Sequence, residues 1–211
     1  MNGVVSRRRW TDLGLALITA LSLYYLYRAI SYRFLHPGRL GPDVFNKQIW
    51  YYSHVAFALP VLFGAPLQFI ASLRDRAPGL HRAVGKAYVV GACSAALLAI
   101  YLGAIVGEYE GSKLSIGLTG VMWIFFTLAA WRFAVAGNFV AHRAFMIRSY
   151  AMTLVLVWLR VMFDLQDYLF FYVTNVDLRD ATREWASWVV PLIVVEMWLN
   201  WGPQFLGRKP S

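Results

Sequence analysis

The chain has 211 residues, of which 59% are hydrophobic and 15% are charged. This composition excludes an ordinary soluble domain, and the length accommodates about six membrane spans of roughly 20 residues with short loops. The formal net charge of +9 does not indicate nucleic-acid binding, because the basic residues are spread over short loops, as orientation signals in a membrane are.

Six apolar stretches are predicted to be membrane-spanning helices. They run from Leu13 to about Ile30, from about Ile49 to Leu73, from His81 to about Val106, from Leu114 to about Val135, from His142 to about Tyr168, and from about Trp185 to Trp201. The first stretch ends in the tyrosines of an aromatic belt and not in a small-residue cleavage site, so we expect it to be a retained span. The predicted fold is all-α, a polytopic six-helix transmembrane bundle that forms one domain over residues 1–211.

The segments between these stretches carry turn and charge signals. The first loop contains His36, Pro37 and Gly38, and the linker from Thr174 to Glu184, which is polar and acidic, is predicted to be the longest loop after it. Glycine and proline punctuate turns, which supports a loop at the first of these segments. With a cytoplasmic N-terminus, most basic residues fall on the inner side and most acidic residues on the outer side, as the positive-inside rule requires. We therefore predict a multi-pass protein of the cell (inner) membrane with both termini cytoplasmic.

The fifth stretch is more polar than a plain membrane anchor. At about 100° per residue, one helix face collects His142, Met146, Ser149, Thr153, Arg160, Asp164 and Asp167. Ionisable groups at membrane depth are costly and normally face a protein interior or a cavity. This face is therefore a candidate functional site, although Arg160 and Asp164 also fit a local i, i+4 ion pair.

The third and fifth stretches open with related sequences. HRAVGKAY begins at His81 and HRAFMIRSY begins at His142. With six spans both helices start at the cytoplasmic side, so the two histidines, followed by Arg82 and Arg143, are expected at about the same depth. The face of His81 also carries Tyr88 and several glycines and alanines, which permit close helix packing or leave room for a flat macrocycle.

Further polar groups are expected near this inner rim. Gln68 lies roughly 21 Å deeper than His54 by helical rise. Glu196 lies at about the depth of Arg148, and an Arg148–Glu196 pair would neutralise two otherwise costly charges. The histidine-arginine pairs also fit simple interfacial anchors that snorkel to the head groups.

Two neutral imidazoles that face each other, with arginines nearby, are what one six-coordinate haem b needs. The imidazole nitrogens fill the axial positions and cationic side chains pair with the propionates. His81 and His142 are therefore the candidate metal ligands. The side chains expected around the cofactor are those of Arg82, Arg143, Arg148, Tyr88, Tyr150 and Gln68.

This arrangement resembles the six-helix diheme cytochromes b that ascorbate reduces, in which histidines on neighbouring helices sandwich each haem. Those proteins carry four bundle histidines in two pairs, and the fourth stretch here has none. His54 has only His36 as a potential partner for a second site. His54 and Arg160 would instead mark an outer electron-donor or quinone site.

A second resemblance covers most of the chain, from about Ile49 to Trp158. A histidine early in the second stretch, HRxxGxxY from His81 and HRxxMIRS from His142 resemble an uncharacterised family of predicted bacterial membrane proteins, domain of unknown function 2306. The resemblance implies the fold and marks special positions without implying an activity. These positions are His54, Gln68, His81, Arg82, Gly85, Tyr88, His142, Arg143, Met146, Arg148, Ser149 and Arg160.

Three functions stay open on the sequence alone. The first is a membrane electron-transfer protein, and thus a potential oxidoreductase, with a quinone or another redox protein as its partner. The second is a non-catalytic accessory or assembly subunit of a larger membrane complex, and a homo-oligomer is equally compatible with the sequence. The third is a small transporter that uses Arg160, Asp164 and Glu196. All three place the chain in contact with the lipid bilayer.

Overall fold

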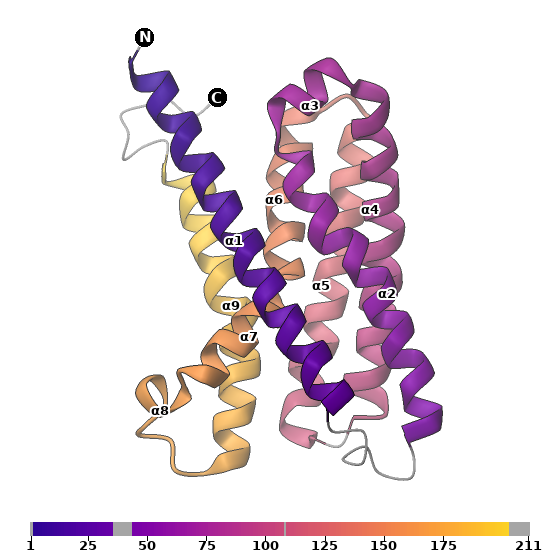
Figure 1. Ribbon diagram of the computed structural model, residues 1–211, viewed down its shortest axis with the longest axis vertical. Helices are drawn as coiled ribbons and strands as arrows, with labels where there is room; N and C mark the ends of the chain where they lie inside the picture. Colours follow the sequence, from indigo (N-terminus) through magenta and orange to yellow (C-terminus); the bar gives the residue numbers. More distant parts are fainter. Residues whose placement is uncertain (1, 36–43, 108, 203–211) are drawn as a thin grey trace.

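The computed structural model is built from helices joined by short connections (Figure 1). It describes residues 2–35, 44–107 and 109–202. The helices are α1 (Asn2–Leu35), α2 (Val44–Gln68), α3 (Ala71–Arg76), α4 (Pro78–Ala99), α5 (Glu110–Val135), α6 (Phe139–Thr153), α7 (Val155–Asp164), α8 (Gln166–Leu169) and α9 (Val176–Asn200), with a π-helical segment, η2 (Ile100–Ile105), that continues α4. No strand occurs in these described ranges, so the all-α prediction is confirmed.

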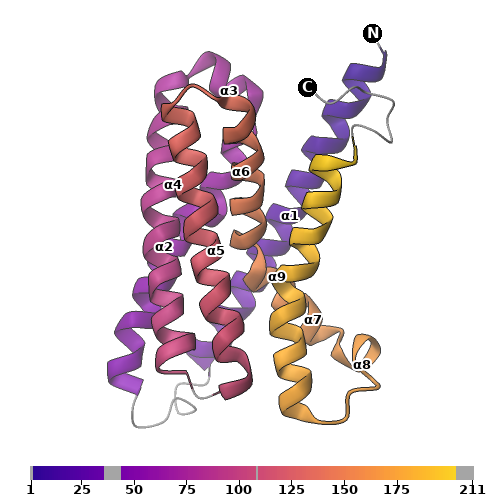
Figure 2. The same ribbon diagram turned by 180° about the vertical axis from the view of Figure 1, so that it is seen from behind.

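The centre of the molecule is a bundle of α2, α4, α5 and α6. Helix α2 packs along α4, α5 packs along α6, and α4 joins the two pairs through α5. Helix α9 packs on α5, α6 and α7, whereas α1 lies obliquely across the outside and contacts α2 and α7. The long helices alternate in direction, so the start of α1 and the end of α9 lie at the same end of the molecule as α3, as the reverse view also shows (Figure 2).

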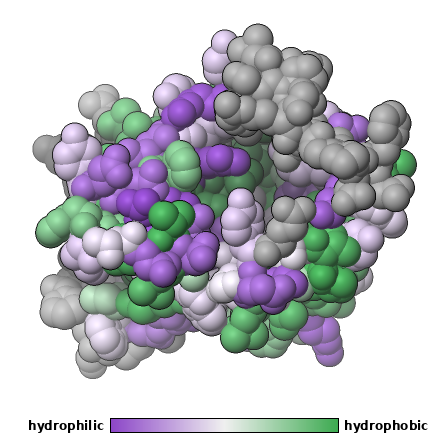
Figure 3. Space-filling model, turned by 90° about the horizontal axis from the view of Figure 1, so that it is seen from below, coloured by the Kyte–Doolittle hydropathy of each residue, from purple (hydrophilic) through white to green (hydrophobic). Residues whose placement is uncertain are grey.

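Two helices in the described part of the chain are long and apolar enough to cross a membrane. They are Pro78–Ile105 and Glu110–Val135, and the bent pair α6 and α7 would count as a third if it forms one span. These segments correspond to the third, fourth and fifth predicted spans. The apolar part of α1 is shorter, Leu13–Arg28. Seen from the end away from α3, hydrophilic side chains gather in a broad patch on one side (Figure 3).

The fifth predicted span is not one straight helix. It breaks at Leu154, and α6 and α7 meet there at an angle of 41°. The hydroxyl of Thr153 donates a hydrogen bond of 3.1 Å to the carbonyl of Ser149, four residues earlier. Such bonds compete with the backbone ladder and bend helices. The bend therefore begins one residue after Thr153, on the polar face that made this stretch unusual.

The linker from Thr174 to Glu184 was predicted to be a loop, and that prediction is wrong for most of its length. Helix α9 begins at Val176, after Asn175, whose side chain accepts a hydrogen bond of 2.9 Å from the Leu178 amide. Asp177 lies in the first turn, where a negative charge favours the helix dipole. The polar residues of the linker are thus a helix start rather than a loop.

Small residues bring the helices of the bundle close together. Ala92, Ala95 and Ala96 on α4 are fully buried. At Gly91 an added Cβ would lie 2.7 Å from Val61 Cγ2 and 2.9 Å from the Phe57 carbonyl oxygen on α2. The glycines and alanines of the third span therefore serve close packing, the first of the two uses predicted for them.

Replacing Gly91 by alanine is expected to destabilise the protein by about 1–3 kcal/mol, because the added methyl group overpacks the α2–α4 contact against backbone that cannot move freely. The measurement is the free energy of unfolding in detergent. Gly79→Ala is the matched control, since nothing lies within 4 Å of a Cβ at that position. A Gly91→Ala variant as stable as this control would contradict the close approach of the two helices.

Candidate functional site

His81 and His142 both lie at the end of the molecule that carries α3. Pro78 occupies the first turn of α4, so His81 follows within that turn. Asn138 caps α6, accepting a hydrogen bond of 3.0 Å from the Ala141 amide one residue before His142. Because α4 and α6 run parallel from the same end, the two imidazoles enter the bundle at similar depths, the placement predicted for them.

The ring of His142 has a defined hydrogen-bonding state. Its Nδ1 lies 2.9 Å from the Ala130 carbonyl oxygen on α5. A carbonyl oxygen can only accept, so Nδ1 carries the hydrogen and Nε2 of the neutral ring keeps its lone pair. A histidine that donates one ring N–H to a backbone carbonyl is the usual arrangement of a metal ligand. His54 makes the same bond, with Nδ1 2.8 Å from the Ala95 carbonyl oxygen.

The ring of His81 has a nitrogen without a hydrogen-bond partner among the described residues. This nitrogen, Nδ1, is buried. The backbone carbonyl of His81 accepts a hydrogen bond of 3.2 Å from Gln68 Nε2, which ties α2 to the start of α4. A buried ring nitrogen without a partner, at the end of the bundle where a second imidazole also enters, is a natural place for a ligand.

The arginines around the two histidines differ in how exposed their side chains are. Arg82 and Arg143 are exposed, and the charge of Arg74 reaches His81 from α3. Arg148 is half-buried, and its guanidinium lies 5.1 Å from the centre of the Phe145 ring. Exposed guanidinium groups at the rim are suited to an anionic group, whereas Arg148 is held within the bundle.

The predicted Arg148–Glu196 pair forms, and it is bidentate. Arg148 Nε donates to Glu196 Oε1 at 2.5 Å and Nη2 donates to Oε2 at 2.8 Å. Asn200 Nδ2 adds a hydrogen bond of 3.0 Å to Oε2. The pair joins α6 to α9 near the end that carries the histidines. Both carboxylate oxygens of Glu196 accept hydrogen bonds from Arg148. Arg148 therefore serves mainly to hold α6 against α9, and binding of a cofactor is secondary.

A double-mutant cycle between Arg148→Ala and Glu196→Ala is expected to give a coupling free energy of about 1.5–3 kcal/mol, the range for hydrogen bonds to charged groups. Unfolding in detergent provides the four free energies. The same cycle between Arg82→Ala and Glu196→Ala is the control, since Arg82 is exposed and, among the described residues, its guanidinium makes neither a hydrogen bond nor an ion pair with this carboxylate. Coupling no greater than in that control would contradict the bidentate pair.

Two helical turns beyond the histidines lies a buried cluster of hydroxyl groups. Tyr88 Oη lies 2.8 Å from Ser149 Oγ and 3.1 Å from Thr153 Oγ1, and Ser149 Oγ lies 2.7 Å from Thr127 Oγ1. Tyr88, Thr127 and Ser149 have almost no exposed surface. The buried Nε1 of Trp123 has no hydrogen-bond partner among the described residues. The cluster thus joins α4, α5 and α6.

The hydroxyl hydrogens of this cluster run toward backbone carbonyls. Thr127 donates to the Trp123 carbonyl at 2.7 Å, so its contact with Ser149 requires Ser149 to donate, and Ser149 in turn accepts from Tyr88. The Tyr88–Thr153 contact then depends on the Thr153 hydrogen, which is shared with the Ser149 carbonyl. Because a backbone carbonyl passes no proton on, this chain of hydroxyls fixes helix positions rather than carrying protons. Tyr88 is therefore engaged below the rim, and Tyr150 stacks on Phe69 with ring centres 5.7 Å apart.

Sequence reasoning found part of this cluster and missed part of it. The helical period of the fifth stretch placed Met146, Ser149 and Thr153 on one face, and the first two are indeed buried. Thr127 and Trp123 lie on a stretch that is otherwise apolar, and nothing in a single helix marks a threonine as the partner of a residue on the next helix. A buried threonine in a uniformly apolar span is the one signal that could have drawn attention to it.

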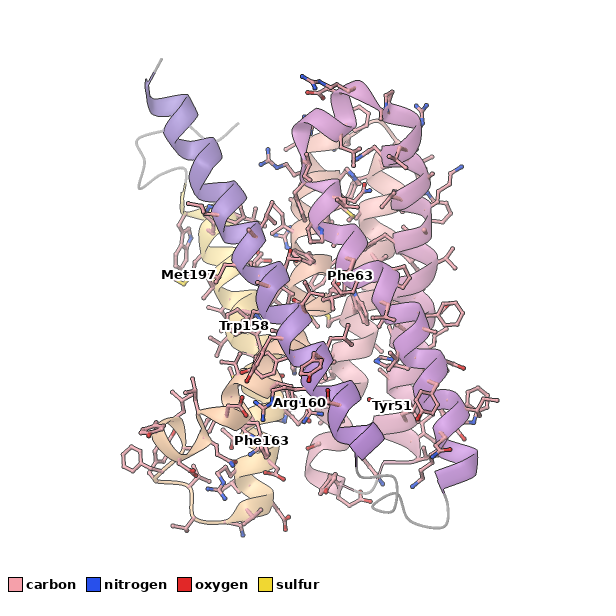
Figure 4. The ribbon with its side chains drawn as sticks, viewed as in Figure 1. Tyr51, Phe63, Trp158, Arg160, Phe163 and Met197 are labelled. Atoms are coloured by element: carbon pink, nitrogen blue, oxygen red, sulfur yellow. The ribbon has the colours of Figure 1, made fainter. Side chains whose placement is uncertain are left out.

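At the opposite end, the predicted Arg160–Asp164 pair is wrong. Asp164 instead accepts hydrogen bonds from Arg28 Nη1 at 2.5 Å and from Tyr25 Oη at 3.1 Å, both on α1. Arg160 lies on α7 toward the end away from α3 (Figure 4), and the described residues offer it no ion pair. Its positive charge interacts electrostatically with Glu184 on α9. His36 lies outside the described residues.

The described residues contain no group of three or more His, Cys, Asp or Glu side chains that could hold a metal ion. A metal centre at this rim would therefore rest on two side-chain ligands, His81 and His142. Two imidazoles are the number of side-chain ligands that a six-coordinate haem b would take from the protein.

The comparisons with known proteins identify a family. A family model described as "Predicted membrane protein (DUF2306)" matches residues 51–199, a range that contains both HR motifs and the Arg148–Glu196 pair. No curated protein and no solved structure matches the chain. The resemblance drawn from the HR motifs is thereby confirmed, while the resemblance to the diheme cytochromes b stays a prediction.

Proposed function

This chain belongs to the family of predicted membrane proteins designated DUF2306, and from that premise we propose that it is a membrane electron-transfer protein that holds one haem b between His81 and His142. The observation that carries the proposal is the state of these two rings. His142 has its Nδ1 occupied by a carbonyl, which leaves Nε2 free. His81 has a buried nitrogen without a partner in the described structure.

The residues around the histidines support this assignment. Arg82 and Arg143 follow the two ligands directly and are exposed at the rim, where guanidinium groups pair well with propionates. Gln68 holds the start of α4 through the His81 carbonyl. The Ala130 carbonyl fixes the tautomer and the orientation of His142. When bound, haem would supply a one-electron carrier, and the protein would supply its two ligands and its partners in charge.

We place the site near the cytoplasmic face of a six-span bundle. The alternating direction of the long helices supports an even number of crossings (Figure 1). The basic residues gather at the end that holds the start of α1 and the end of α9, which supports cytoplasmic termini and a multi-pass protein of the inner membrane. A quinone or a soluble redox protein would then exchange electrons with the haem.

The decisive experiment is a reduced-minus-oxidised absorption spectrum of the full chain, purified from cells that are supplied with haem. We expect an α-band of haem b at one haem per chain. Colourless protein with no α-band would overturn the proposal. Reconstitution of the purified chain with haem, followed by the same spectrum, guards against incomplete loading.

A small transporter is the second candidate, and one observation favours it. The fifth span is broken at Leu154 with a bend of 41°, and broken helices mark the substrate sites of many transporters. The break lies next to Thr153, whose hydroxyl belongs to the buried cluster. This function predicts a colourless protein whose Thr153→Val variant straightens the helix. Copurification of a colourless chain with a larger complex would favour an accessory subunit instead.

A further inference from the structure

The turn between α7 and α9 projects sideways from the bundle. Beyond the bend at Leu154, α7 runs obliquely, and α8 with the residues after it lies outside α9 in both ribbon views (Figures 1 and 2). We call residues 165–178 the aromatic turn. Because it lies beyond the bundle helices, its surface meets lipid, water or another protein.

This turn is held in place rather than loosely attached. Arg183 on α9 is buried and donates to Gln166 Oε1 and, at 2.6 Å, to Asp180 Oδ1. Its guanidinium also lies 4.8 Å from the centre of the Phe163 ring at the end of α7. Phe170 is buried beneath the turn. The surface that the turn presents is therefore a built feature of the fold.

Most of the exposed side chains of the aromatic turn are apolar. Tyr168, Phe171 and Tyr172 are 81%, 75% and 67% exposed. The rings of Phe171 and Tyr172 contact each other edge to face, with centres 5.5 Å apart. Contiguous apolar surface of this kind marks a place of interaction. The remaining exposed apolar residues of the turn are Leu165, Leu169, Val176 and Leu178.

The exposed aromatic residues continue around the same end of the molecule. Tyr27 near the end of α1, Trp50 near the start of α2 and Tyr109 before α5 are all exposed. Tyrosine and tryptophan are enriched at the two membrane–water interfaces, where the ring meets the acyl region and the polar group stays hydrated. The aromatic turn thus extends an aromatic belt outward from the bundle.

We propose that the aromatic turn is an interfacial anchor that inserts Tyr168, Phe171 and Tyr172 into the head-group region of the lipid leaflet at the end away from α3. The lipid surface is an uncharged one, because the exposed carboxylate of Asp177 would repel anionic head groups, whereas that of Asp167 is balanced by Arg179, whose Nη1 lies 4.0 Å from it. Anchors at the interface set the tilt of the helices they belong to. This one lies beyond the far end of α7 and acts independently of any haem at the other end of the molecule.

The test uses a fluorescent probe on the turn. Cys93→Ala removes the native thiol, Tyr172→Cys then accepts an NBD label, and the full chain is placed in phosphatidylcholine nanodiscs. We expect strong quenching by nitroxide on the lipid head group, weaker quenching by nitroxide deep in the acyl chain, and protection from aqueous iodide. A probe at Asp177→Cys is the control, and it should be open to iodide.

A charge placed beside the probe sharpens the result. Phe171→Glu in the Tyr172-labelled chain should shift the emission to the red and restore quenching by iodide. Since Phe171 is exposed, the variant should unfold at the unchanged temperature. Replacing part of the phosphatidylcholine by phosphatidylserine should not strengthen the head-group quenching.

Three results would overturn the anchor. A Tyr172 probe as open to iodide as the Asp177 control would place the turn in water. A probe shielded from both iodide and lipid nitroxides would place it against another protein or a second copy of the chain. Head-group quenching that grows with phosphatidylserine would show a lipid surface of the wrong charge.

Discussion

Replacing either His81 or His142 by alanine is expected to abolish the α-band of haem b and to leave the purified chain colourless. Each histidine would supply one of the two axial bonds, so either substitution leaves the haem with a single side-chain ligand. The measurement is the haem-to-protein ratio together with the reduced-minus-oxidised spectrum. The fold should survive both substitutions, because the two rings lie at the rim. Of these two rings, only that of His142 makes a hydrogen bond to a described residue, the Ala130 carbonyl.

His54→Ala is the matched control for these variants. His54 makes the same Nδ1 bond to a backbone carbonyl, that of Ala95, but lies roughly 21 Å away by helical rise. Its replacement should leave the α-band in place. Equal haem loss in all three variants would contradict the assignment, because it would show a general effect on the fold.

A methionine at one ligand position separates ligation from packing. His142→Met should retain haem and raise the reduction potential, as methionine-histidine ligation does in cytochromes c. A purely structural role of His142 would not move a redox potential. A variant with unchanged potential and unchanged haem content would show that His142 is not a ligand.

Replacing Tyr88 by alanine is expected to cost about 3–5 kcal/mol of stability, the range for removing a fully buried aromatic ring from a core. Tyr88 is 1% exposed, and its hydroxyl links Ser149 and Thr153 on α6 to α4. The measurement is the free energy of unfolding in detergent. The loss should exceed that of every other single substitution considered above.

The hydroxyl itself is tested by Tyr88→Phe, which keeps the ring. We expect a loss of about 1–3 kcal/mol, because buried hydroxyl groups are left without a partner. Tyr168→Phe is the control, since Tyr168 is 81% exposed and its hydroxyl is free to meet water. A Tyr88→Phe variant as stable as that control would contradict the role of the cluster in joining the helices.

The local chemistry of the chain could be predicted where it depends on neighbours in sequence. The repeated HR motifs placed His81 and His142 at the same end, because alternating helices return to one side after every second crossing. The Arg148–Glu196 pair was predicted because two charges at one depth in an apolar medium must find each other. Both arguments need only helical rise and the number of crossings.

Other contacts depend on how a helix is rotated about its axis and where it bends. The rise per residue determines neither of these. Asp164 was expected to bind Arg160 one turn away, yet it binds Arg28 and Tyr25 on α1. The bend at Leu154 turns α7 toward α1, so the nearer partner in space is far away in sequence. The start of α9 was missed for a related reason, since its polar residues are typical of a loop until Asn175 is seen to cap a helix.

By itself, the sequence determined the helical class, the membrane family and the two histidines that enter from one end, because hydropathy and helical period act along a single helix. Only the tertiary structure decided which hydroxyls meet Tyr88, which cation holds Asp164, and that the turn after α8 stands outside the bundle with its aromatic rings exposed. Those outcomes depend on how each helix is rotated and tilted against its neighbours. Rotation and tilt are set by packing between helices and cannot be derived from any single helix.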